Sequence, residues 1–140
     1  VTYMSLEEVL KSADVVSVHL KLSDQSKELL NAPRLRLMKK SAYLVNTARG
    51  AIVDESALVK LLQENGIAGA ALDVFSEEPL PPDHPLLRLE NVVLTPHLGW
   101  PTDAGFEGFA EHAAENILDY MDGKLTRVVN PAALERRKRK

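Results

Sequence analysis

The sequence contains no cysteine and no long apolar run. The lack of cysteine excludes disulfide bonds, thiolate metal ligands and cysteine catalysis, and it is compatible with a reducing cytoplasm. No apolar run approaches the roughly 20 residues that a membrane-spanning helix needs. We therefore expect a cytoplasmic protein without a membrane partner. No metal site is predicted.

The sequence also lacks an excess of positive charge. Seventeen Lys and Arg residues stand against 20 Asp and Glu, and the formal net charge is −3 at pH 7. This balance gives no electrostatic basis for nucleic-acid binding. The one basic run, residues 136–140, is terminal, and such runs are usually solvated. We therefore expect no nucleic-acid partner. The 140 residues are 45% hydrophobic, which is enough for a domain with a core.

Short apolar segments alternate with amphipathic segments along the chain. Strands are predicted at residues 15–20, 42–45, 67–74 and 92–95. Helices are predicted after Ser5 and at residues 29–40, 54–65 and about 102–122. This alternation is typical of a parallel sheet that helices cover on both faces. The predicted fold class is therefore α/β, with a parallel Rossmann-type sheet and flanking helices.

A polar residue lies at the carboxyl end of each predicted strand or just after it. These residues are His19, Arg49, Asp73 and His97. The carboxyl ends of parallel strands share one edge of the sheet, and open α/β sheets bind ligands at that edge. The pattern therefore predicts a site there.

The residue types at this edge suggest a chemistry. The planar guanidinium of Arg49 is suited to holding a carboxylate at two points. His97 could exchange a proton near neutral pH, and Glu78 could orient it. Simpler interpretations stay open. Arg49 would then be a solvated residue in an ordinary turn, His97 would only close a turn, and Glu78 would be an exposed loop acid beside Glu77. His84 and His112 have no partner in the sequence pattern and are expected at the surface.

Five segments together resemble the D-isomer-specific 2-hydroxyacid dehydrogenase family. The resemblance includes members that act on phosphoglycerate and members that reduce glyoxylate or hydroxypyruvate. In chain order the five segments are residues 12–20 (SADVVSVHL), 38–54 (MKKSAYLVNTARGAIVD), 71–75 (ALDVF), 77–79 (EEP) and 95–99 (TPHLG). The resemblance extends from about Ser5 to about Pro131. Lys21 departs from it, because the family more often has proline there.

The resemblance implies a role for each candidate site residue. Arg49 would bind the carboxylate and carbonyl of a 2-oxo acid, His97 would be the acid/base, and Glu78 would be its partner. Asp73 would meet the nicotinamide carboxamide. The cofactor would be NAD or NADP, with NAD favoured. The residues implied at the cofactor are Leu20, Thr47, Ala48, Arg49, Asp73, His97 and Gly99.

None of the seven glycines forms the Gly-x-Gly-x-x-Gly loop that seats a dinucleotide pyrophosphate. In the family that loop lies upstream of the position of Val1. The resemblance thus implies that residues 1–123 are the second half of an NAD(P)-binding domain, including a long interdomain helix near 102–122. Residues 124–140 would be a partly disordered tail that returns to a substrate domain.

The expected function is hydride transfer between NAD(P)H and a small 2-oxo acid or D-2-hydroxy acid, as a fragment that is inactive alone. One alternative is an NAD(H)-sensing binding module of the corepressor type without significant turnover. Another is a structural domain that uses the sheet only as an interaction surface. A half-sheet would leave apolar strand and helix surface uncovered, including part of the apolar stripe between Phe106 and Met121. The resemblance also implies that the long helix contributes to a dimer interface, so we expect a homodimer or a larger assembly.

Overall fold

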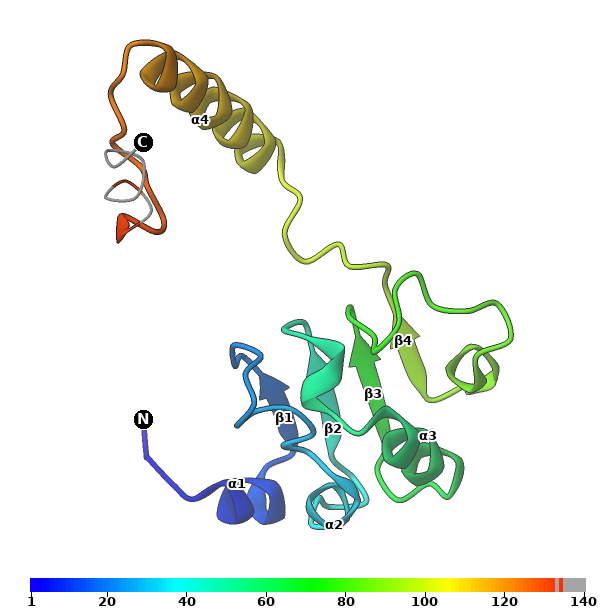
Figure 1. The fold of residues 1–140 in the computed structure, drawn as a ribbon. Coiled ribbons are helices and arrows are strands. Elements are labelled where there is room, and N and C mark those ends of the chain that lie inside the picture. The colour runs from blue at the N-terminus through cyan, green and yellow to red at the C-terminus, as the bar shows by residue number, and fades with distance from the viewer. Residues whose placement is uncertain (133, 135–140) are drawn as a thin grey trace. The chain divides into compact units, whose positions relative to one another are not determined.

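The computed structural model describes residues 1–132 and 134 of the chain (Figure 1). The chain divides into two compact units, residues 1–99 and the part from Trp100 onward. The basic run at 136–140 and part of the tail predicted to be disordered lie outside the described residues. No helix in the described part of the chain has the length and apolarity to cross a membrane.

The first unit is built on a four-stranded parallel sheet. Its strands are β1 (Val15–Val18), β2 (Tyr43–Asn46), β3 (Gly69–Leu72) and β4 (Val92–Leu94), in the spatial order β1-β2-β3-β4. The helical elements between and before them are α1 (Leu6–Ser12), α2 (Ala32–Leu35), η1 (Gly50–Ile52), α3 (Glu55–Gln63) and η2 (Pro85–Arg88). The predicted parallel α/β sheet is confirmed.

Local capping explains where the helices begin. At α1, the Ser5 hydroxyl accepts from the Glu8 N–H at 3.3 Å, and the Ser5 N–H donates to the Glu8 carboxylate at 2.9 Å. At α3, Asp54 accepts from the Ala57 N–H at 3.0 Å. Both caps agree with the predicted helix starts, after Ser5 and at residue 54.

The helix predicted at residues 29–40 is much shorter than expected. Only α2 is helical there, with Asn31 capping the Arg34 N–H at 3.2 Å and Pro33 in the first turn. Beyond it, Leu37 and Met38 donate to carbonyls three residues back. The apolar spacing suggested a longer helix. Instead, α2 ends at Leu35 and a turn follows, and both Leu35 and Met38 pack into the core.

The core lies on one face of the sheet only. Alternate strand residues such as Val16, Leu44 and Leu72 are buried together with Leu10 of α1, Leu35 of α2 and Leu58 of α3. On the other face, Val15, Tyr43 and Val93 are 58%, 52% and 64% exposed. The prediction that helices cover both faces was therefore wrong for this chain.

The strand order gives the physical reason. Crossovers between parallel strands are right-handed, so the direction in which the strand order advances decides which face the connection covers. Every step here advances in the same direction, from β1 to β4. All three connections must therefore lie on the same face, and the alternation of elements alone does not reveal this.

The second unit contains one long helix, α4 (Asp103–Met121). The Thr102 hydroxyl caps it by accepting from the Gly105 N–H at 3.0 Å. The Trp100 ring packs at 5.4 Å from the Phe106 ring and 6.0 Å from the Phe109 ring. No residue of α4 is buried. Its exposed apolar side chains are Phe106, Phe109, Ile117, Leu118, Tyr120 and Met121.

Candidate active site

The turn after β2 carries Arg49 and is fixed by a buried amide. The Asn46 side chain is 1% exposed. Its Oδ1 accepts from the Ala48 N–H at 3.0 Å, and its Nδ2 donates to the Arg49 carbonyl at 3.0 Å. Both bonds satisfy backbone groups that would otherwise be unpaired at the end of the strand. The position of Arg49 is thus set by the core and not by a flexible loop.

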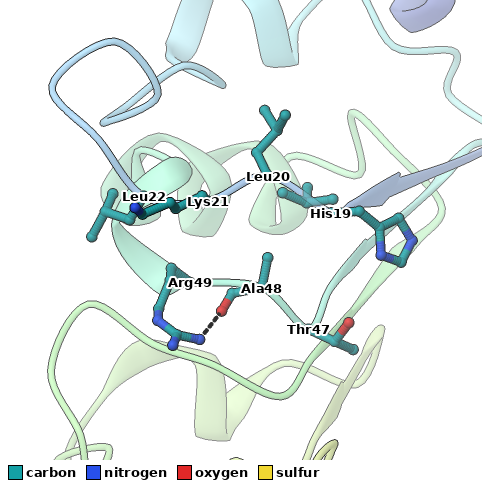
Figure 2. A pocket seen from close by; sticks show the side chains of 8 residues that line it. His19, Leu20, Lys21, Leu22, Thr47, Ala48 and Arg49 are labelled. Atoms are coloured by element: carbon teal, nitrogen blue, oxygen red, sulfur yellow. Dashed lines mark hydrogen bonds between the residues drawn. The ribbon is translucent and has the colours of Figure 1, made fainter. Parts of the chain in front are cut away.

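Arg49 itself is exposed, and one of its Nη atoms donates to the carbonyl of Ala48 at 2.6 Å. It lines a hollow of about 460 Å³ at the carboxyl ends of β1 and β2. In Figure 2, His19 and Thr47 lie at one end of this hollow and Arg49 and Leu22 at the other. Leu20, Thr47 and Ala48, which were predicted to line a cofactor, all border it.

Asp73 follows β3 and is 6% exposed. Its Oδ1 accepts from the Thr95 hydroxyl and, at 2.7 Å, from the Leu98 N–H. Its Oδ2 accepts from the Gly99 N–H at 2.8 Å. Burial alone would raise the pKa of Asp73, but these hydrogen bonds and the nearby charge of His97 outweigh it and lower the pKa. Asp73 therefore holds the segment after β4 against the end of β3.

Glu78 and His97 form a hydrogen-bonded pair from two different segments. The Nδ1 of His97 lies 2.7 Å from the Oε2 of Glu78, and the Phe75 N–H donates to Oε1 at 2.9 Å. The bond with His97 is the main cause that lowers the pKa of Glu78, followed by the bond from Phe75; the charge of Arg49 contributes less. Glu78 is thus held as a carboxylate at neutral pH.

The backbone at His97 is unusual, with φ at +59°. Non-glycine residues rarely adopt this left-handed conformation, and it is often found at functional sites. Here the bend turns the Leu98 and Gly99 amides toward Asp73 while the imidazole reaches Glu78. One conformation thus satisfies both interactions.

The structure brings the predicted residues to one sheet edge but not into one hollow. Glu78 and His97 line a second hollow of about 540 Å³, which is otherwise mostly apolar. Arg49 is near enough for its charge to affect Glu78. His19 instead hydrogen-bonds Ser17, at 2.8 Å between Nε2 and Oγ.

One cluster was missed from the sequence. His84 was expected at the surface without a partner, yet its side chain is only 19% exposed and its Nε2 lies 3.4 Å from Glu55 Oε1. The available signal was His84 directly before Pro85, because a polar residue there can cap the short helix η2. Among the residues that the structure describes, no cluster of His, Asp and Glu could hold a metal ion.

The arrangement of these residues is suited to anion binding and to proton transfer. Arg49 presents a guanidinium at the carboxyl end of β2, where it can bind an anion. His97 is fixed through Nδ1, so that Nε2 is the nitrogen available for proton exchange. No partner occupies that nitrogen among residues 1–132 and 134. An anion site and a histidine oriented by a carboxylate suit proton transfer to or from a small acid.

Comparison with known proteins identifies the family. Residues 1–99 match the family model described as "D-isomer specific 2-hydroxyacid dehydrogenase, NAD binding domain". A glyoxylate reductase of Thermofilum pendens is 50% identical over 123 residues, which are 88% of this chain and 36% of that protein. This chain thus spans a little over a third of that relative's length.

Solved structures agree. The TT0316 protein of Thermus thermophilus superposes with a TM-score of 0.82 at 51% identity, covering 86% of this chain and 39% of that one. The NAD-complexed D-isomer specific 2-hydroxyacid dehydrogenase of Lactobacillus delbrueckii ssp. bulgaricus superposes with a TM-score of 0.79 at 36% identity, covering 90% and 42%. The predicted NAD-binding Rossmann fold is confirmed, and the chain belongs to the D-isomer specific 2-hydroxyacid dehydrogenase family.

Proposed function

We propose that this chain provides the carboxylate-binding and proton-transfer residues of an oxidoreductase. The enzyme interconverts a small 2-oxo acid and the corresponding D-2-hydroxy acid with NAD(P)H. The observation that carries the proposal is the 2.7 Å contact between His97 and Glu78 at the sheet edge where Arg49 lies. The glyoxylate reductase name of a 50% identical relative supports a small 2-oxo acid.

In this proposal Arg49 binds the substrate carboxylate. The guanidinium uses one donor on its neighbour's carbonyl and has four more N–H groups to offer. Two of them in parallel match the two oxygens of a carboxylate. Binding at two points fixes the orientation of the adjacent carbonyl, so that the face open to hydride is set by the protein.

His97 then protonates the carbonyl oxygen from Nε2 as the carbonyl carbon accepts hydride. The proton lost from His97 ends on the new hydroxyl group, and in the oxidation direction it returns. The Glu78 carboxylate stabilises the protonated imidazole and fixes its orientation, as an acid orients a histidine in a catalytic triad. The lowered pKa of Glu78 keeps this carboxylate charged at neutral pH.

The residues present fit a nicotinamide dinucleotide. A bound reduced nicotinamide supplies the hydride. The hollow bordered by Leu20, Thr47 and Ala48 lies at the carboxyl ends of β1 and β2, where open α/β sheets bind dinucleotides. Asp73 Oδ2 accepts one hydrogen bond among the described residues, and an oxygen with two lone pairs can accept another, as from a carboxamide N–H. Gly99, whose N–H donates to the same Asp73 oxygen, would lie beside the carboxamide.

The test is an assay of the complete protein in which this chain occurs. Oxidation of NADH and NADPH is followed separately with glyoxylate, hydroxypyruvate, pyruvate and phosphohydroxypyruvate. His97→Asn should lower kcat by roughly 10²- to 10⁴-fold, the usual range for a general acid. His112→Asn, an exposed histidine on α4, should leave kcat unchanged.

Tight NADH binding without turnover of any 2-oxo acid would contradict the proposal and favour a nucleotide-sensing module. The 140-residue chain alone should be inactive, because it carries no Gly-x-Gly-x-x-Gly loop for the pyrophosphate. Ordinary turnover by this chain alone would contradict that expectation.

A further inference from the structure

Glu55, the first residue of α3, makes contacts that the helix itself does not require. Asp54 already caps α3 through the Ala57 N–H. Glu55 reaches instead to the loop between β3 and β4. Its Oε2 accepts from the Ser76 N–H at 3.0 Å, and its Oε1 lies 3.4 Å from His84 Nε2. With a side chain only 18% exposed, this is a largely buried carboxylate that holds two points of one loop.

The His84 ring is oriented so that its Nε2 faces Glu55. Its Nδ1 accepts from the Leu86 N–H at 3.3 Å, as the cap of η2. In the neutral ring this assigns the proton to Nε2, the nitrogen that lies 3.4 Å from Glu55 Oε1.

The two points that Glu55 holds enclose Glu78. Ser76 comes two residues before Glu78, and His84 comes six residues after it. The residue next to Ser76 is Phe75, whose N–H donates to Glu78 Oε1 at 2.9 Å. A displacement of Ser76 would therefore move the donor that fixes the Glu78 carboxylate.

The loop that Glu55 holds also contacts the turn that carries Arg49. Gly50 lies so close to the 75–76 backbone that a Cβ there would be 2.0 Å from the Phe75 carbonyl carbon. The Arg49 turn, the start of α3 and the loop that carries Glu78 are therefore in direct contact.

We propose that Glu55 and His84 are positioning residues that clamp residues 76–84 and so keep Glu78 within hydrogen-bonding distance of His97. The catalytic consequence of this clamp rests on the proposed function; the clamp itself does not. Neither residue touches substrate or cofactor in this proposal. They act through Glu78 alone.

The experiment follows the ionisation of Glu78 in the 140-residue chain, by NMR of its ¹³C-labelled side-chain carboxyl group. In the unmodified chain the titration midpoint should lie below that of an ordinary glutamate, because His97 and the Phe75 amide hydrogen-bond the carboxylate. In Glu55→Ala and in His84→Ala the midpoint should rise by roughly half a pH unit. The double variant should add little to either change, because both residues serve one clamp.

The matched control is Glu64→Ala. Glu64 caps the other end of α3 and, among the described residues, pairs only with Lys60, at 4.0 Å. This variant removes a glutamate of the same helix without touching residues 76–84, so the Glu78 midpoint should stay unchanged.

A folded Glu55→Ala chain with an unchanged Glu78 midpoint overturns the proposal. If Glu55→Ala does not fold, Glu55→Gln decides, because it keeps an oxygen for the Ser76 N–H but turns an amide donor toward His84. A rise of the Glu78 midpoint in Glu55→Gln supports the clamp, and an unchanged midpoint overturns it.

In the complete protein, Glu55→Ala should lower kcat by roughly three- to tenfold with little change in KM, because Arg49 still binds the carboxylate. An unchanged kcat, with the Glu78 midpoint raised, would overturn the catalytic consequence. If the unmodified complete protein turns over no 2-oxo acid, the proposed function fails and the NMR result still decides the clamp.

Discussion

At the scale of single residues, Asp73 both stabilises the fold and holds the segment that carries His97. It is buried and accepts three hydrogen bonds from the segment after β4. A buried carboxylate with three donors is stabilised in its charged form despite the cost of desolvation. The charged form of Asp73 therefore holds Leu98 and Gly99, the two residues that follow His97.

Asp73→Asn should lower the free energy of unfolding by about 1–3 kcal/mol at neutral pH, because an amide NH₂ replaces one accepting oxygen and leaves a donor unpaired. The pKa of Asp73 is lowered in the folded state. The carboxylate therefore stabilises the fold above the unfolded pKa of about 3.9, and this contribution is lost as the pH falls through the lower, folded value. Urea unfolding at pH 7 and in acid measures both effects.

Asp83→Asn is the matched control, because Asp83 is an exposed loop aspartate. It should leave the urea midpoint unchanged at either pH. An Asp73→Asn deficit that persisted undiminished in acid would show that lost packing, and not the ionised carboxylate, is responsible.

The residues of the site could be placed from the sequence, but their partners only in part. Arg49, Asp73 and His97 follow strands in the pattern, and the structure has them at the carboxyl ends. The pairing of Glu78 with His97 agrees with the expected one. Two of the three donors to Asp73, the Leu98 and Gly99 amides, follow the left-handed bend at His97. No residue type signals that bend, since glycine is the usual occupant of this conformation. The catalytic roles remain predictions.

At the scale of elements, the close contact between η1 and the loop after β3 leaves no room for a side chain at Gly50. Gly50→Ala would put a Cβ 2.0 Å from the Phe75 carbonyl carbon, and backbone cannot rotate away as a side chain can. We expect a loss of about 1–3 kcal/mol or more in stability, the cost typical of overpacking. Urea unfolding of the first unit, followed by near-UV signals, is the measurement.

Gly108→Ala supplies the opposite case. Gly108 lies within α4, and a Cβ there would meet nothing within 4 Å. Alanine is the better helix former by roughly 0.5–1 kcal/mol, so the helical signal of α4 should persist to higher temperature. A destabilised Gly108→Ala chain would mean that another surface covers this part of α4.

The elements themselves were largely predictable, because apolar β-branched runs and capping residues mark them locally. The clear failure is α2, where Leu35 and Met38 have helical spacing but only Ala32–Leu35 is helical. Spacing reports which side chains face the core, and a turn of i→i+3 bonds can satisfy the same requirement.

At the scale of the whole molecule, apolar surface remains exposed in both units. It comprises Val15, Tyr43 and Val93 on the open sheet face and the apolar side chains of α4. Patches of this kind favour association. The predicted homodimer therefore remains an expectation, to be tested by sedimentation.

Sedimentation velocity over a wide concentration range should show a dimer or a larger species that dissociates on dilution. Ile117→Glu, which puts a charge on an exposed apolar position of α4, should shift the distribution toward monomer by roughly tenfold in dissociation constant. Glu111→Gln, at an exposed polar position of the same helix, should not. A compact monomer at every concentration would contradict the expectation.

The direction of the strand order has a consequence for how the molecule is made. Each strand pairs with the one synthesised just before it, and paired residues lie about 20 to 30 positions apart in the sequence. The sheet can therefore grow strand by strand as the chain leaves the ribosome. Asp73 emerges before Thr95, Leu98 and Gly99, which satisfy its carboxylate. The edge that carries Asp73, Glu78 and His97 is therefore the last part of this unit to form, and an incomplete nascent chain would already possess a sheet while the Glu78–His97 pair was still unformed.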